Sequence, residues 1–169
     1  MKLQVALDLL TIEDALELAG KVAEHVDIIE LGTPLIKAEG LSAVTAIKEA
    51  HPTKIVFADM KTMDAGELEA DIAFKAGADL VSVLGTADDS TIAGAVKAAQ
   101  SHNKGIVVDL IGVADKVSRA KEARAMGAKL IRFLTSAPEP LTLETALTSP
   151  AMATRRATVT ATSATATAT

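Results

Sequence analysis

The sequence predicts an α/β protein built on a parallel sheet, and three observations support this fold class. Six short apolar runs recur along the chain at nearly even spacing. Near-continuous apolar runs of this length are typical of strands that are buried on both faces. Amphipathic helical patterns separate the runs, so strand and helix alternate, and this order implies right-handed βαβ units.

The expected strands are rich in β-branched and apolar residues. They lie in KLQVALDL (2–9), VDIIELG (26–32), KIVFADMK (54–61), ADLVSVLG (78–85), GIVVDLIG (105–112) and AKLIRF (128–133). Helices are expected at Thr11–His25, Glu67–Ala76, Ser90–Gln100 and Ala114–Met126. Thr11 and Asp14 have capping-box spacing, and Ser90 is a candidate cap. Thr33 and Pro34, after the second run, are expected to form a turn.

A barrel is favoured over an open doubly wound sheet. An open sheet normally carries a glycine-rich phosphate turn after its first strand, whereas this strand leads into DLLTIED, which has no glycine. The uniform repeat and the polar residues at strand ends favour a (β/α)8 barrel of the TIM type. Only six units are visible, so the expected fold is a barrel domain over residues 1–134, truncated to about six βα units.

The composition changes after Phe133. Residues 135–169 contain no glycine, and the last 13 are only Ala, Thr, Val and Ser. Low complexity predicts a disordered tail that is foreign to the domain, as a shifted reading frame or a substituted C-terminus would produce. An open sheet of six strands would expose two unpaired edges, so an unstable or aggregation-prone chain is expected.

The composition also excludes several classes of function. The net charge is −5 and no basic run occurs, which argues against nucleic-acid binding. The absence of cysteine excludes disulfides, thiolate metal sites and cysteine nucleophiles. No apolar run is long enough for a membrane span, and the first residues do not resemble a signal peptide. A soluble, cytoplasmic protein is expected.

Charged residues end several strands on a face that is otherwise apolar or small. Because alternate residues of a strand share a face, Asp59 and Lys61 lie together, and Asp8, Glu30 and Asp109 have the same placement on their own strands. Grouped buried carboxylates are tolerable only when cations compensate them. Lys61 supplies one positive charge, and hard carboxylate oxygens without His or Cys nearby point to Mg²⁺ as a further cation.

Structural roles remain the alternative for these residues, although Glu30 is harder to explain in this way because glutamate is a poor cap. Asp8 and Asp109 could be turn or cap residues, and Asp64 could cap the following helix. Asp59 and Lys61 could form a purely structural ion pair. All three histidines precede strands, at the barrel face opposite to the expected site: His25, His51 and His102.

The stretch ADMKTMDAGELEADIAFKAGADLV, with VDIIELGTPL before it and VLGTADDSTI after it, resembles the 3-hexulose-6-phosphate synthases. These belong to the orotidine-monophosphate-decarboxylase-like group of compact TIM barrels. The likeness runs from Met1 to about Lys129, and D-x-K-x-x-D, here Asp59, Lys61 and Asp64, is the motif of the group.

The resemblance implies an aldehyde-lyase that adds formaldehyde to the sugar phosphate ribulose 5-phosphate, with Mg²⁺ as cofactor and a homodimer as the assembly. Glu30 and Asp59 would be Mg²⁺ ligands, and Asp8 would bind and orient substrate. Lys61 would bind substrate and act in catalysis beside the developing enediolate oxygen, together with Asp59. Asp64 would reach into the partner's active site.

The chain departs from the family pattern in its last part. The family has a histidine at the end of the sixth strand, thought to be the proton-transfer base, and the equivalent position here is about Leu134. The expected seventh and eighth strands, with their phosphate-binding loops, are also absent from the sequence. Impaired activity is therefore expected. Two alternatives stay open: a 3-keto-gulonate-6-phosphate decarboxylase-like enzyme, and a non-catalytic half-barrel that acts only as a subunit partner.

Overall fold

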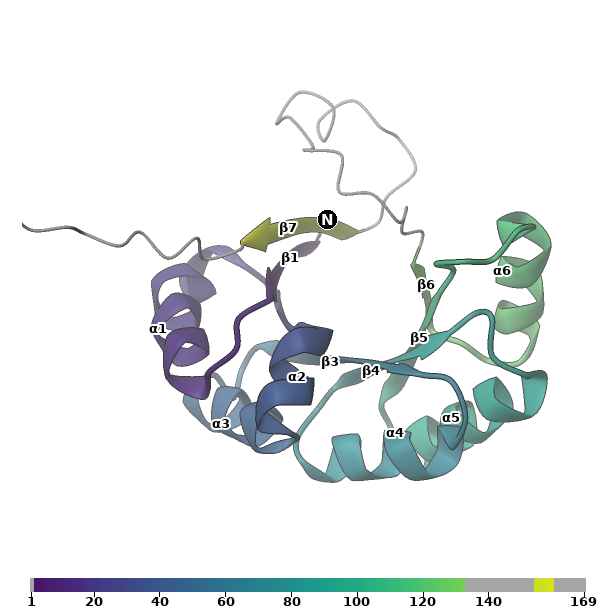
Figure 1. Ribbon diagram of the computed structural model, residues 1–169, viewed down its shortest axis with the longest axis horizontal. Coiled ribbons are helices and arrows are strands. Elements are labelled where there is room, and N and C mark those ends of the chain that lie inside the picture. The colour runs from purple at the N-terminus through teal and green to yellow at the C-terminus, as the bar shows by residue number, and fades with distance from the viewer. Residues whose placement is uncertain (1, 133–153, 160–169) are drawn as a thin grey trace, which may run out of the picture.

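The computed structural model describes residues 2–132 and 154–159, and it contains one parallel sheet with helices packed on it. The strands follow the order β6-β5-β4-β3-β2-β1-β7. They form an arc with the helices on its outer side (Figure 1). The strands are β1 (Lys2–Leu7), β2 (Ile28–Leu31), β3 (Ile55–Thr62), β4 (Leu80–Leu84), β5 (Gly105–Asp109), β6 (Leu130–Arg132) and β7 (Thr154–Val159). All six strands predicted before residue 134 are confirmed.

Four of the six α-helices that the structure describes begin and end close to where the sequence places them, and the two between β2 and β3 were not predicted. They are α1 (Ile12–Val22) with the short 3-10 helix η1 (Ala23–His25), α2 (Thr33–Glu39), α3 (Ser42–Ala50), α4 (Gly66–Lys75), α5 (Asp89–Ser101) and α6 (Lys116–Ala125). The backbone N–H of Asp14 donates to Thr11 Oγ1 at 3.2 Å, which confirms Thr11 as the cap of α1.

Two local predictions are wrong. Thr33 and Pro34 begin helix α2 rather than a turn, because proline is well tolerated in the first helical turn. Ser90 lies inside α5, whose N-cap position is Asp88, so it does not cap the helix.

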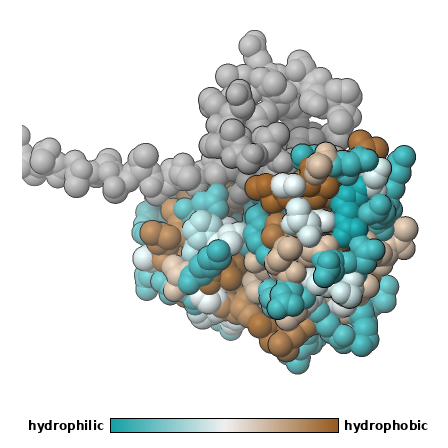
Figure 2. All heavy atoms as spheres, turned by 45° about the vertical axis from the view of Figure 1, so that its right-hand side comes forward, coloured by the Kyte–Doolittle hydropathy of each residue, from teal (hydrophilic) through white to brown (hydrophobic). Residues whose placement is uncertain are grey.

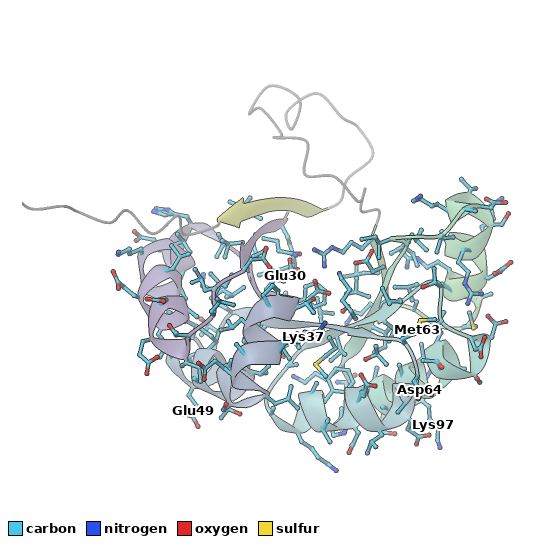
Figure 3. All side chains as sticks on the ribbon, in the orientation of Figure 1. Glu30, Lys37, Glu49, Met63, Asp64 and Lys97 are labelled. Carbon is cyan, nitrogen blue, oxygen red and sulfur yellow. The ribbon has the colours of Figure 1, made fainter. Side chains whose placement is uncertain are left out.

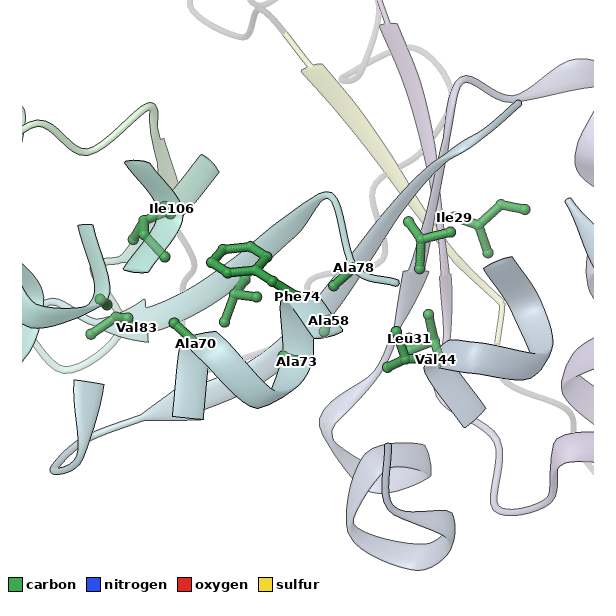
Figure 4. Packing of buried hydrophobic residues seen from close by; sticks show 14 of the residues in the cluster. Ile29, Leu31, Val44, Ala58, Ala70, Ala73, Phe74, Ala78, Val83 and Ile106 are labelled. Carbon is green, nitrogen blue, oxygen red and sulfur yellow. The ribbon is translucent and has the colours of Figure 1, made fainter. Parts of the chain in front are cut away.

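The two faces of the sheet bury different side chains, as strand alternation predicts. On the outer face, strand residues pack against helix residues such as Phe74 and Val44 in the large core, shown in Figure 4. The inner face holds a smaller apolar cluster made of Ile28, Phe57, Leu80 and Val107, flanked by Ile55 and Leu130. The inner cluster lies on the same side of the strands as the charged residues described below.

Part of the tail adds a strand to the sheet. Residues Thr154–Val159 form β7, which pairs in parallel with β1 from Lys2↔Thr154 to Leu7↔Val159. The β-branched residues Thr154, Thr158 and Val159 favour such an extended conformation, and here the β1 edge is covered. The two sheet edges in the described part of the chain are therefore those of β6 and β7. The rest of the expected disordered tail, 135–153 and 160–169, lies outside the described residues.

Hydrophilic and apolar residues are mixed over the face of the molecule seen in Figure 2. Six large apolar side chains are exposed among the described residues: Leu3, Leu10, Met63, Leu68, Ile72 and Val117. Within the same residues, every helix is too short or too polar to cross a lipid bilayer.

Gly66 allows α4 to lie against α5, and we expect Gly66→Ala to destabilise the fold. A Cβ at this position would stand 1.9 Å from the backbone oxygen of Thr91, where no flexible side chain can move aside. The free energy of unfolding in urea, followed by circular dichroism, should fall by about 1–3 kcal/mol.

Gly20→Ala is the matched control for this prediction. Gly20 lies inside α1, and an added Cβ would have no heavy atom within 4 Å. This variant should gain about 0.5–1 kcal/mol of stability because alanine loses less conformational entropy in a helix. Equal effects of the two substitutions would contradict the steric explanation.

Candidate active site at the carboxyl ends of the strands

Asp59 and Lys61 form the centre of a buried charged cluster on the inner face of the sheet. Lys61 Nζ lies 3.0 Å from Asp59 Oδ1 and 2.9 Å from Oδ2. The predicted pairing on one strand face is thus present, but the strand is not regular. Between Ala58 and Thr62 the register to β4 advances by only two residues, from Val81 to Val83, so β3 bulges.

Lys61 has a strained backbone at this bulge. Its φ is 53°, in the left-handed region that residues with a Cβ rarely adopt. Its N–H donates to Ser82 Oγ at 2.9 Å, and Ser82 Oγ donates to Asp59 Oδ1 at 2.7 Å. Ser82 therefore fixes both the backbone of the lysine and the orientation of the aspartate. Strain of this kind is characteristic of functional positions.

Asp109 joins the cluster from β5. Its side chain is fully buried, and its Oδ2 lies 2.5 Å from Lys61 Nζ. Its Oδ1 accepts a hydrogen bond from the backbone N–H of Ile111 at 3.0 Å. The ammonium of Lys61 is thus held between two buried carboxylates from different strands, which leaves it little freedom of position.

Arg132, on β6, is the residue of the cluster that the sequence analysis missed. Its Nη1 lies 3.1 Å from Asp59 Oδ2 and its Nη2 lies 2.9 Å from Glu30 Oε1. The guanidinium carbon is 5.7 Å from the ring centre of Phe57. Gln4 Nε2 also donates to Glu30 Oε2. Strand alternation could have found Arg132, because Leu130 lies in the inner apolar cluster.

Asp8 follows β1 at the rim of this cluster and is half-buried. A Cβ on Gly32 would lie 2.0 Å from Asp8 Oδ1, so the glycine allows the carboxylate to approach the β2–α2 connection closely. The structure therefore places Asp8 at the carboxyl ends of β1 and β2, as the sequence predicts. Its role toward a substrate stays a prediction.

Asp64 is not brought into the cluster. Its side chain is exposed, and its backbone oxygen accepts a hydrogen bond from Thr91 Oγ1 of α5 at 2.9 Å. Figure 3 shows Asp64 toward α4 and α5, away from Glu30. Any catalytic role of Asp64 would therefore require another chain, and this role also stays a prediction.

The cluster as it stands does not fit the expected Mg²⁺. Carboxylate oxygens of Glu30 and Asp59 are suitable ligands by chemistry. However, the guanidinium of Arg132 contacts both of them and takes the position where a bridging cation would bind. Among residues 2–132, no group of three or more His, Asp or Glu side chains is arranged to hold a metal ion.

Electrostatics favours the ionised form of Asp59. Burial alone would raise the pKa of its carboxyl, but the positive charges of Arg132 and Lys61 and the hydrogen bond from Ser82 outweigh it and lower the pKa. Burial would likewise lower the pKa of Arg132, but Glu30, Asp59 and Asp109 raise it. Asp59 and Arg132 thus stay charged at neutral pH.

This lowered pKa predicts acid destabilisation. A carboxyl whose pKa is lower in the folded state contributes stability above its unfolded pKa of 3.8, and loses it as the pH falls through the folded pKa. We expect the free energy of unfolding in urea to fall below about pH 4, by up to about 1.4 kcal/mol per pH unit for this group. Asp59→Asn should show a shallower fall. Identical pH profiles for the two proteins would contradict the assignment.

The fold and this cluster define an α/β-barrel scaffold of the kind that enzymes use, with charged side chains gathered at the carboxyl ends of parallel strands. Residues 1–136 match the model of the Orotidine 5'-phosphate decarboxylase / HUMPS family, and the chain belongs to this family.

Individual relatives agree with this family. The chain is 82% identical over 133 residues to a 3-hexulose-6-phosphate synthase of Mycobacterium gastri, covering 79% of this chain and 64% of that protein. A crystal structure of a 3-hexulose-6-phosphate synthase superposes with a TM-score of 0.77 and 82% identity, over 78% of this chain and 63% of the other. A crystal structure of a 3-keto-L-gulonate-6-phosphate decarboxylase from Vibrio cholerae superposes with a TM-score of 0.74 and 38% identity, over 77% of this chain and 60% of the other. These matches confirm the predicted barrel type.

The chain spans somewhat under two thirds of the length of these relatives. The match to the family model ends at residue 136, close to the last described residue of β6. The shared part thus contains strands β1 to β6 and the charged cluster.

Proposed function

We propose that this chain carries the first six βα units of a 3-hexulose-6-phosphate synthase and has an impaired form of its aldehyde-lyase activity. The single observation that supports this most is the ammonium of Lys61, held between Asp59 and Asp109 at the carboxyl ends of the strands. The high identity to a named synthase over the same residues points to the same reaction.

In this proposal, the reaction joins formaldehyde to ribulose 5-phosphate. A proton is removed from the carbon beside the ketone, the resulting enediolate attacks the formaldehyde carbon, and the new alkoxide takes up a proton. Lys61 would lie beside the enediolate oxygen and stabilise its negative charge. Asp59 and Asp109 would hold the ammonium in place, and Asp8 at the rim would orient the substrate. No step is assigned to Mg²⁺, because Arg132 contacts both of its expected ligands.

The proposed assembly is a homodimer in the cytoplasm. Met63, Leu68 and Ile72 are exposed apolar residues just before α4 and along it, close in sequence to Asp64. Pairing at this surface would bury them and bring Asp64 near another chain. Sedimentation as a monomer at all concentrations would exclude this assembly.

A formaldehyde-consumption assay with ribulose 5-phosphate, with and without Mg²⁺, tests the activity. We expect the rate to be at least about 10²–10⁴-fold below that of a full-length synthase, because Leu134 stands where the family has its proposed base. Any residual turnover should disappear in Asp59→Asn. That variant still allows the Lys61–Asp109 and Arg132–Glu30 pairs, so it should stay folded.

Lys97→Met is the matched control, because within residues 2–132 the ammonium of Lys97 forms only an exposed ion pair with Glu67. It should leave the rate unchanged. A rate equal to that of the full-length enzyme, or residual turnover that survives Asp59→Asn, would refute the proposal.

The decarboxylase is a second candidate, supported by the similarity to 3-keto-L-gulonate-6-phosphate decarboxylase. The same ammonium could stabilise an enediolate formed by loss of CO₂ instead of loss of a proton. Release of CO₂ from 3-keto-gulonate 6-phosphate without consumption of formaldehyde would favour it. Folded protein with neither activity would favour the non-catalytic half-barrel.

A further inference from the structure

The buried charged cluster contains more negative charge than the ammonium of Lys61 can balance. Three carboxylates lie in it, those of Glu30, Asp59 and Asp109, and the side chains of Glu30 and Asp109 are fully buried. The ammonium of Lys61 contacts two of these three carboxylates, those of Asp59 and Asp109. A fully buried glutamate needs a nearby positive charge to remain ionised.

Arg132 supplies that charge from inside the fold. Its side chain is only 10% exposed, and its two terminal nitrogens reach different carboxylates, Glu30 at 2.9 Å and Asp59 at 3.1 Å. A planar guanidinium suits this bridging geometry. The backbone of Arg132 is fixed as well, because β6 is paired with β5 in the register Asp109↔Arg132.

A divalent cation and this guanidinium cannot occupy the site together. A cation bound by both Glu30 and Asp59 would need the oxygens that Arg132 contacts, and it would meet a positive charge within a few ångströms. At such a distance, like charges repel by several kcal/mol at the effective dielectric constant of a protein.

We propose that Arg132 is a built-in counter-ion that replaces a divalent metal between Glu30 and Asp59, so that this chain takes up no metal at the cluster. The inference concerns the same site as the proposed function. It is tested by metal binding rather than by turnover, so that either proposal can fail without the other.

Titration of the full chain with Mn²⁺, followed by electron paramagnetic resonance, tests the inference. Mn²⁺ prefers the same oxygen ligands as Mg²⁺ and is directly visible. The unmodified chain should show no stoichiometric binding at the cluster. Arg132→Met keeps an apolar stem against Phe57 and removes the charge, and it should bind one Mn²⁺ at least about tenfold more tightly. Adding Asp59→Asn to that variant should abolish the gain.

Arg124→Met is the matched control, because Arg124 is exposed on α6 and removal of its charge should leave Mn²⁺ binding unchanged. An equal gain in both arginine variants would overturn the inference. The inference would also be overturned if the unmodified chain bound Mn²⁺ stoichiometrically and its amide resonances of Asp59 and Ser82 were broadened by the paramagnetic ion. This last measurement needs no variant, and absence of the broadening supports the inference even if Arg132→Met fails to fold.

Discussion

Lys61→Met is expected to lower the free energy of unfolding by about 3–5 kcal/mol. The substitution removes the ammonium that contacts both Asp59 and Asp109 but keeps a side chain of similar length. Asp109 is fully buried, and Lys61 is its only ion-pair partner among the described residues. A buried carboxylate left without a cation in contact either remains charged at high cost or takes up a proton, and both weaken the fold.

Urea denaturation followed by far-ultraviolet circular dichroism measures this loss, since the chain has no tryptophan for fluorescence. The double variant Lys61→Met with Asp109→Asn should recover part of the lost stability, because it removes the negative charge of Asp109 together with the positive charge that balanced it. Lys97→Met is the control on the surface and should change stability by less than about 1 kcal/mol. A loss below 1 kcal/mol in Lys61→Met, or no recovery in the double variant, would contradict the electrostatic account of the cluster.

The sheet and the inner face could be predicted from the sequence because both depend on local patterns. Short apolar runs separated by helices give parallel strands, and strand alternation places Glu30, Asp59 and Lys61 on one face. The structure brings these residues to the same end of the sheet. The fold class followed for the same reason, since each βα unit repeats the same pattern.

The balance of charge in the cluster could not be predicted in the same way. Which cation meets Glu30 depends on how far β6 is shifted against β5 and on the curvature of the whole sheet, and neither is a local property. Strand alternation could have placed Arg132 on the inner face, but it could not have predicted that the guanidinium contacts two different carboxylates.

The bulge at Lys61 and the helices α2 and α3 were missed for physical reasons of another kind. A regular strand already placed Lys61 beside Asp59, so nothing in the sequence demanded the left-handed φ of 53° that the structure has. Between β2 and β3, Gly40 has a φ of 66° and divides the segment into two short helices. Each is too short for a clear helical period.

Loss of the pairing between β7 and β1 is the second change for which we expect a large effect, on both stability and association between chains. The substitutions Arg156→Pro and Ala157→Pro place two adjacent prolines in the middle of β7. They remove two successive backbone N–H donors, which point to opposite sides of the strand, so the donor that faces β1 is lost in either case. We expect the strand to leave the sheet, with a loss of about 1 kcal/mol for each ladder hydrogen bond that is broken. The edge of β1, which now pairs over six residues, would then be exposed, and a bare parallel edge promotes association between chains.

Static light scattering and the soluble fraction after centrifugation measure that association. The control variant, Thr165→Pro with Ala166→Pro, carries the same two prolines near the C-terminus, beyond β7, and should behave as the unmodified chain. If the β7 prolines leave both stability and solubility unchanged, β7 does not protect the sheet, and the aggregation expected from the sequence of a six-strand sheet should already be seen in the unmodified chain. If only the β7 variant aggregates, the six residues of β7 act as the cover of the β1 edge, and they explain how a chain with six βα units can remain in solution.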